Sequence, residues 1–198
     1  RRLSLSQYSS NFILKGGLFI YTLTEFQSRA TQDIDFLMRQ LSNDIGKVKD
    51  IMEEISLVPT ANDYITIEVL KAETITPDKE YQGVSVKFIG RIKQVKIPFS
   101  IDIGMDDVIV PKAVKRMIKT RLSDFEAPEV YTYSLESTIA EKFDAILKRM
   151  EATSRMKDFF DIYYLSSMFD FEGRKLQEAI WQTIQHRGTP YEANSFDR

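Results

Sequence analysis

Two aspartates, Asp33 and Asp35, lie one residue apart in the segment RATQDIDFLM, residues 29–38, whose other residues are typical of a buried β-strand. Because alternate residues of a strand face the same side, the two carboxylates project together while Ile34 and Phe36 point into the core. Like charges this close repel unless a cation lies between them. The pair therefore either sits in water at a strand edge or holds a metal ion.

A third candidate carboxylate is Asp102, which lies in the apolar segment 95–103 between Ile101 and Ile103. If its strand pairs beside the strand of the first two aspartates, three carboxylates converge. Oxygen-only sites of this kind suit Mg²⁺ or Mn²⁺ and leave coordination positions for substrate phosphates. Asp106 and Asp107 are alternatives for the third position, and a solvated acid at a strand edge is the simpler interpretation of Asp102.

A turn at Gly16 and Gly17 follows the short apolar run 12–14 and Lys15, and precedes the apolar segment 18–26. Backbone N–H groups without side chains can approach a triphosphate closely at the start of a helix. A tight turn with no ligand is the alternative. Arg29 and Thr31, which precede the aspartate pair, either contact phosphate or cap a turn.

The elements that must position these residues follow from hydrophobic periodicity and turn residues. Strands are predicted at 12–14 and 33–38, a buried helix at 18–26 and a surface helix at 44–56. Three largely alternating segments, 64–70, 84–89 and 95–103, are predicted to form neighbouring antiparallel strands, with an edge or bulge at Pro98.

From Ser134 onward the pattern is helical. Ser134 is predicted to cap a helix whose apolar stripe runs from Leu135 to Met150, and a second helix carries Met156 to Leu165 and is ended by Gly173. A last amphipathic helix covers 176–185. We therefore expect an α+β domain over residues 1–125 and a helical module over residues 126–198.

Composition narrows the possible functions. The net charge is only −2, and the absence of cysteine excludes disulfides and cysteine zinc sites. A single histidine, His186, excludes a multi-histidine metal cluster, and no apolar run approaches the ~18 residues that span a membrane. These features are compatible with the cytoplasm. The chain opens on Arg1-Arg2 without methionine, which indicates a fragment of a longer protein.

Three segments resemble one known family. FILKGGLFIYTLTEFQSRATQDIDFLM, residues 12–38, resembles the polymerase-β-type nucleotidyltransferases, in which a small-residue turn precedes a strand with two aspartates. It is most similar to the AbiEii branch, the toxin half of bacterial abortive-infection and toxin–antitoxin pairs. Residues 136–149, ESTIAEKFDAILKR, are similar to the family's lysine-bearing helix, and residues 155–163, RMKDFFDIY, to its R-x-K-D-x-x-D motif.

The resemblance implies a mixed sheet with flanking helices and a metal-dependent transferase. Its catalytic residues would be Asp33, Asp35, Asp102, Lys142 and Asp158. Its metal ligands, for Mg²⁺ or Mn²⁺, would be Asp33, Asp35 and Asp102. Its nucleotide- and phosphate-binding residues would be Lys15, Gly16, Gly17, Arg29, Thr31 and Lys142.

The helical residues also have simpler interpretations. Lys142 adjoins the apolar stripe between Ile139 and Phe143, so its stem either carries the ammonium into a cleft or extends it into solvent. Asp158 and Asp161 share a helix face, and with Arg155 and Lys157 they can form an ordinary surface ladder of ion pairs. On that interpretation Asp161 is structural.

Three functions remain open on the sequence. The first is an intracellular, cytoplasmic growth-arrest toxin that transfers a nucleotidyl group from an NTP to an acceptor such as the tRNA 3′ end. The second is AMP or UMP transfer to a protein, and the third is an NTP-binding regulator without turnover. RNA binding would use the basic run Lys112, Lys115, Arg116, Lys119 and Arg121, or this run is an ordinary solvated face. Family resemblance also implies an antitoxin partner, and the lack of a long apolar run predicts no membrane association.

Overall fold

The structure, a computed structural model, describes residues 1–61, 63–75, 83–148 and 155–190. The chain forms two compact units. Unit 1 comprises residues 1–106 and 114–132, and unit 2 comprises residues 107–113 and 133–198. Each unit is described by itself.

Unit 1 is built on a seven-stranded mixed sheet in the order β3-β4-β5-β2-β1-β7-β6. The strands are β1 (Phe12–Lys15), β2 (Asp35–Met38), β3 (Thr66–Ile75), β4 (Gly83–Ile92), β5 (Val95–Met105), β6 (Val114–Met117) and β7 (Glu129–Thr132). β2 pairs in parallel with β5, and β1 in parallel with β7. The other neighbours are antiparallel. The predicted α+β class is therefore confirmed.

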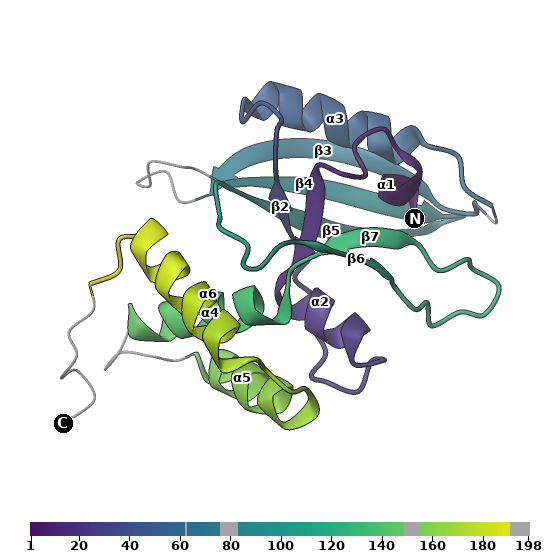
Figure 1. The fold of residues 1–198 in the computed structure, drawn as a ribbon. Coiled ribbons are helices and arrows are strands. Elements are labelled where there is room, and N and C mark those ends of the chain that lie inside the picture. Colours follow the sequence, from purple (N-terminus) through teal and green to yellow (C-terminus); the bar gives the residue numbers. More distant parts are fainter. Residues whose placement is uncertain (62, 76–82, 149–154, 191–198) are drawn as a thin grey trace. The chain divides into compact units, whose positions relative to one another are not determined.

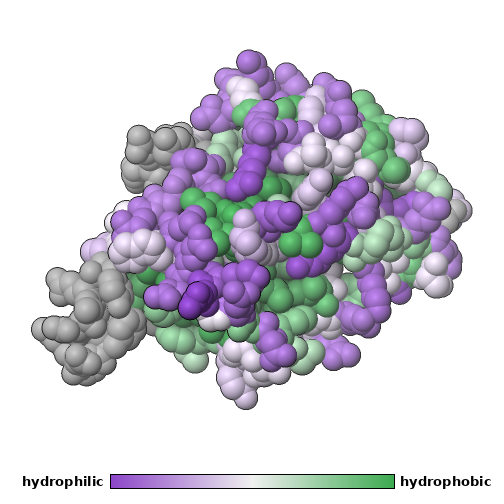
Figure 2. Space-filling view, in the orientation of Figure 1, coloured by the Kyte–Doolittle hydropathy of each residue, from purple (hydrophilic) through white to green (hydrophobic). Residues whose placement is uncertain are grey.

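The helices of unit 1 are α1 (Arg2–Leu5), α2 (Gly16–Leu23) and α3 (Ile45–Leu57). Asp44 caps α3, because its side chain accepts a hydrogen bond of 2.9 Å from the backbone N–H of Lys47. The apolar stripe of α3 packs on one face of the sheet, and Figure 1 shows the helix lying along that face. Its outer surface is largely hydrophilic in Figure 2. The core of unit 1 is thus the layer between α3 and the sheet.

The three alternating segments form β3, β4 and β5, with the predicted antiparallel pairing. Pro98 lies in the half of β5 that pairs with β4, whereas β2 joins β5 only at residues 102–105. Among the pairings of the described residues, the first half of β5 is therefore an edge, as Pro98 predicted. The strand predicted at 33–38 is shorter and begins at Asp35.

Unit 2 contains α4 (Leu135–Leu147), α5 (Met156–Met168) and α6 (Gly173–His186). Ser134 caps α4 as predicted, accepting a 3.0 Å hydrogen bond from the Ser137 N–H. The prediction that Gly173 ends the second helix was wrong. The backbone is already extended at Phe169, after which Gly173 begins α6. The end of the predicted stripe, at Met150, lies outside the described residues.

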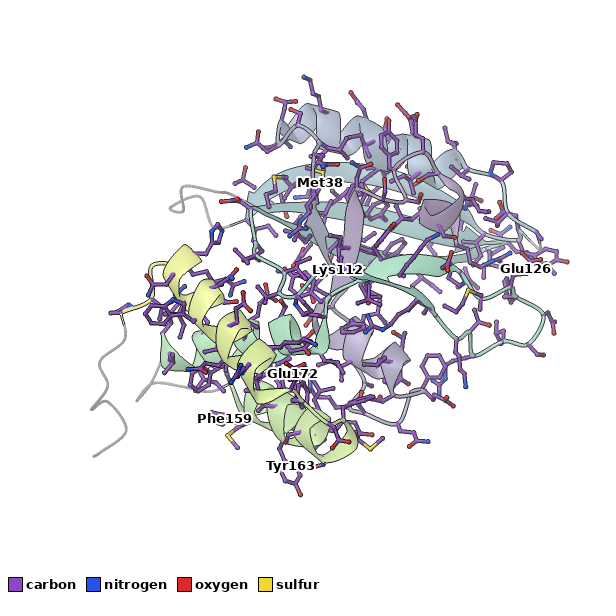
Figure 3. The ribbon with its side chains drawn as sticks, viewed as in Figure 1. Met38, Lys112, Glu126, Phe159, Tyr163 and Glu172 are labelled. Carbon is purple, nitrogen blue, oxygen red and sulfur yellow. The ribbon has the colours of Figure 1, made fainter. Side chains whose placement is uncertain are left out.

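The outer face of α5 carries exposed aromatic side chains. Phe159 and Tyr163, one helical turn apart, are 43% and 71% exposed. Figure 3 shows both pointing away from the helix. Among the described residues, no helix is long and apolar enough to cross a membrane. The expected domain boundary after residue 125 stays a prediction; β7 belongs to the sheet of unit 1 through its pairing with β1.

Candidate active site

Two of the predicted carboxylates lie side by side on one face of the sheet. Asp35 on β2 is in register with Asp102 on the parallel strand β5, and the Asp102 N–H donates a 2.9 Å hydrogen bond to the Ile34 carbonyl. Neighbouring strands are about 4.8 Å apart, so residues in register project together. The Ser85 hydroxyl, opposite Asp102 on β4, donates a 2.7 Å hydrogen bond to Asp102 Oδ1. This bond fixes one carboxylate while the other faces the glycine turn.

Gly16 lies directly against Asp35. Its φ of +68° is a conformation that favours glycine. A Cβ atom built on Gly16 would also overlap the Asp35 carboxylate, lying 2.9 Å from its Cγ. A side chain at this position would therefore be strained and would displace the Asp35 carboxylate. The consequence is that the backbone at the start of α2 touches one of the paired carboxylates.

A lysine shares this face of the sheet. Lys15 is opposite Asp35 in the β1–β2 pairing. Its Nζ lies close to Gly104, since a Cβ built there would be 3.5 Å from Nζ. Gly104 follows Asp102 by two residues on β5, so it faces the same side. The ammonium group of Lys15 therefore extends over the face that carries the two carboxylates.

The segment before β2 forms a turn. The Thr31 hydroxyl accepts a 3.2 Å hydrogen bond from the Asp33 N–H. A Cβ on Gly17 would lie 3.1 Å from the same hydroxyl oxygen. The turn-capping interpretation of Thr31 is thus confirmed, and the turn packs against Gly17. Phosphate contacts from Thr31 and the half-buried Arg29 stay predictions.

The convergence of three carboxylates is not found. In the described part of the chain, no three histidine, cysteine, aspartate or glutamate residues could hold a metal ion together. β2 begins only at Asp35, and Asp33 is exposed in the irregular segment before it, where its N–H bonds to the Thr31 hydroxyl. Two carboxylates in register still suit Mg²⁺, which commonly binds one or two carboxylates and completes its shell with water and phosphate.

In unit 2, Lys142 is buried between two aspartates. Its Nζ lies 3.0 Å from Asp158 Oδ1 and 2.6 Å from Asp161 Oδ2. Arg155 adds a 3.2 Å ion pair to the other oxygen of Asp158. Both aspartates are less than 5% exposed, so the interpretation as a surface ladder was wrong. Asp161, assigned to a structural role from the sequence, is one of the two direct partners of the lysine.

The pKa of Asp158 reflects opposing effects. Burial raises the pKa of this carboxyl group, but the charges and hydrogen bonds of Lys142 and Arg155 outweigh burial and hold the pKa below its ordinary value of 3.8. Asp158 therefore carries a negative charge at neutral pH. The sequence placed these residues on two successive helices without indicating how they pair.

A second, half-buried ionic cluster surrounds Arg187, a residue that sequence reasoning missed. Its guanidinium contacts Asp107 at 2.8 Å, Glu141 at 2.5 Å and Asp144 at 3.1 Å. Burial lowers the pKa of Arg187, but the charges of Glu141 and Asp107 outweigh burial and raise the pKa above its ordinary value. Asp107, an alternative to Asp102 on the sequence, is thus committed to Arg187 within unit 2. The partners lie up to 80 residues apart, so no local pattern signals them.

The basic run at 112–121 is largely engaged within unit 1. Lys115 pairs with Glu129 at 2.6 Å, and Lys119 with Glu25 at 2.5 Å. The guanidinium of Arg116 lies over the Phe19 ring and that of Arg121 over the Phe26 ring. Lys112, in unit 2, is exposed. The run is therefore a partly neutralised surface, and contact with RNA stays a prediction.

The fold is similar to that of solved nucleotidyltransferase structures. MenT4, a nucleotidyltransferase toxin from Mycobacterium tuberculosis H37Rv, has a similar fold with a TM-score of 0.62 at 13% identity, over 98% of this chain and 65% of MenT4. JHP933 from Helicobacter pylori has a similar fold with a TM-score of 0.50 at 18% identity, over 85% of this chain and 61% of JHP933. An antigenic nucleotidyltransferase-like protein from Paracoccidioides brasiliensis gives 0.51 at 12% identity, over 95% and 89%.

The chain thus spans just under two thirds of the length of MenT4 and of JHP933. At these identities the likenesses show a common fold, which is the nucleotidyltransferase fold with a mixed sheet and flanking helices. A search of curated proteins gave no match. The sequence model of the nucleotidyl transferase AbiEii toxins of type IV toxin–antitoxin systems matches residues 1–198. The paired carboxylates and the glycine turn thus occur in a chain that belongs to the AbiEii family.

Proposed function

We propose that this chain binds a nucleoside triphosphate and transfers the nucleotidyl group to an acceptor hydroxyl, and that this reaction arrests growth. The observation that carries the proposal is the contact of the Gly16 turn with Asp35, itself in register with Asp102. The backbone at Gly16, which a phosphate group can approach closely, then lies on the same face of the sheet as the two carboxylates. Membership of the AbiEii family supports the same reaction.

Different residues of unit 1 would bind the phosphates and the metal ion. The N–H groups at the start of α2, eight residues long, are oriented to donate to phosphate oxygens, and glycine lets the ligand come close. Lys15 supplies a positive charge on the same face. Asp35 and Asp102 would hold a divalent cation, with Asp33 as a further proposed ligand. When bound, Mg²⁺ or Mn²⁺ would neutralise phosphate charge and help to activate the attacking oxygen.

The transfer forms one bond and breaks one bond. The acceptor oxygen bonds to the α-phosphorus, the bond from that phosphorus to the bridging oxygen breaks, and pyrophosphate leaves while the acceptor's proton passes to solvent. Roles for Lys142 in reaching the phosphates, and for Asp158 as an essential carboxylate, rest on family resemblance alone.

We propose the tRNA 3′ end as the acceptor, with the basic run at 112–121 as the surface that would contact RNA. Protein nucleotidylylation and NTP binding without turnover are the alternatives. An antitoxin encoded alongside and a cytoplasmic location belong to the same proposal through the type IV toxin–antitoxin family.

The three alternatives separate in one labelling experiment. The protein is incubated with each α-³²P-labelled NTP, Mg²⁺ and either total tRNA or cell lysate. Label on tRNA supports the proposed reaction, whereas label on protein supports the second alternative. Binding of NTP with no transfer in either mixture supports the third and contradicts enzymatic turnover.

Charge-neutral variants test the site. Asp35→Asn and Asp102→Asn keep the side-chain shape and remove the carboxylate, so we expect both to lose labelling and growth arrest. Asp50→Asn, an exposed position on α3, is the matched control and should behave as the wild type. Full labelling by a folded Asp35→Asn protein would contradict the proposed mechanism.

A further inference from the structure

Unit 1 contains an apolar cavity on the face of the sheet opposite the paired carboxylates. Its volume is about 370 Å³, and five phenylalanine rings supply much of its wall. The principal lining residues are Phe12, Phe36, Phe88, Phe99, Ile101 and, from α3, Met52. It lies in the layer between α3 and the sheet, among the residues of the main hydrophobic cluster of unit 1.

The size of the cavity suits a small ligand. An apolar cavity of about 150 Å³ holds one benzene molecule, so a cavity of about 370 Å³ has room for about fifteen non-hydrogen atoms. Ligand pockets begin at about 300 Å³ and combine apolar walls with a few polar groups. The cavity is open to solvent on one side, and water against its apolar walls has few hydrogen-bonding partners, so an apolar ligand body can displace that water favourably.

The rim of the cavity has a net positive charge. The charged residues that line it are two cations, Arg1 and Arg2, and one carboxylate, Asp63. Arg2 is neutralised by Asp63 at 2.6 Å and also donates to the Ile65 carbonyl. The guanidinium of Arg1 donates to the Ala61 carbonyl and lies 4.9 Å from the centre of the Phe125 ring, so no carboxylate in the lining offsets its charge. An anionic group is therefore the complement of this rim.

We propose that this cavity binds an amphipathic carboxylate, with its hydrocarbon body among the aromatic rings and its carboxylate group at Arg1. An arginine can hold a carboxylate through charge-assisted hydrogen bonds. The apolar body would gain binding free energy in proportion to the surface that it removes from water. The ligand class is thus set by the apolar wall and the charge at the opening.

The cavity adjoins the proposed active site through two strands. Phe36 follows Asp35 on β2, and Ile101 precedes Asp102 on β5. Successive residues of a strand face opposite sides, so the same backbone carries a carboxylate on one face and a cavity wall on the other. A ligand that moves these two strands moves the carboxylates, and this regulatory part rests on the proposed function.

Ligand binding is tested first, by a measurement that does not depend on enzymatic activity. Decanoate and its uncharged analogue decanol are titrated by calorimetry into the wild type, and decanoate should bind about tenfold more tightly. Arg1→Gln should remove that difference, and Ser56→Leu should weaken both ligands, because Ser56 lines the cavity and leucine would occupy part of it. Lys47→Gln, an exposed position on α3, should bind as the wild type.

Absence of decanoate binding to the wild type, equal binding of both ligands, or an unaltered affinity in a folded Ser56→Leu protein would overturn the site. Labelling with and without decanoate then tests the regulatory part, and unchanged labelling at saturating decanoate would overturn that part alone. If no form of the protein labels any acceptor, the proposed function fails while the calorimetric result for the cavity still holds.

Discussion

Substitution of Gly16 by alanine separates backbone strain from displacement of the carboxylate. Gly16 has φ of +68°, and a residue with a side chain held in the left-handed region costs about 1–2 kcal/mol. The added methyl group also overlaps the Asp35 carboxylate, which can rotate away at little cost because it is the end of a side chain. Backbone strain should therefore lower the free energy of unfolding, whereas displacement of the carboxylate should lower the transferase activity.

Gly188 provides the matched control. Its φ is +58°, and a Cβ built there meets nothing within 4 Å. Gly188→Ala should lower the free energy of unfolding by the same 1–2 kcal/mol or so, but without displacing any functional group. For a chain of this length, each kcal/mol lowers Tm by about 2–4 °C.

The assay compares the two variants by urea unfolding and by transfer of ³²P label. We expect similar losses of stability and a loss of labelling only in Gly16→Ala. If Gly16→Ala labels its acceptor as well as Gly188→Ala does, the contact between the glycine turn and Asp35 has no role in the reaction. If it loses labelling only in proportion to the unfolded fraction, strain alone accounts for the effect.

The buried ion pairs of unit 2 yield three further predictions, each measured by urea unfolding. Lys142→Met removes the buried cation that Asp158 and Asp161 share and should cost about 3–5 kcal/mol. Lys148→Met, at an ion pair whose lysine is 36% exposed, should cost under about 1 kcal/mol, and equal costs would contradict the burial argument. Because its pKa is depressed in the folded state, Asp158 should stabilise the fold at neutral pH and lose that contribution as the pH falls below 3.8. The stability difference between wild type and Asp158→Asn should therefore shrink in acid, and a difference independent of pH would refute the depressed pKa. Arg187→Met should cost about 3 kcal/mol, because Asp144, 1% exposed, loses its guanidinium partner, and an unchanged unfolding midpoint would refute that account.

The sequence predicts those parts of the fold that depend on local patterns. Ser134 caps α4 and Asp44 caps α3 because capping needs only a suitable side chain and the N–H three residues ahead. The alternation around Asp102 predicts its strand, and its register with Asp35 follows once β2 and β5 are neighbours. Neither segment by itself predicts that β2 and β5 are neighbours, because strand order depends on contacts between distant parts of the chain.

The same distinction explains the failures. Asp33 appeared to be a strand residue because DID alternates, but the Thr31 hydroxyl bonds its N–H and holds it in a turn. Lys142 was correctly placed beside an apolar stripe, yet its short contact with Asp161 depends on the packing of two helices. Periodicity gives the face of a helix, whereas ion-pair partners need the tertiary structure.

The short segment 107–113 has a consequence for how the protein can be synthesised and cut. It belongs to unit 2, and its Val110 carbonyl accepts hydrogen bonds from Ser134 and Ser137, although residues 114–132 return to unit 1. A recombinant fragment starting at residue 133 would therefore lack an integral piece of its own interior. On the ribosome, Asp107 emerges 80 residues before Arg187, so the ionic cluster of the helical unit can form only after residue 187 has been translated.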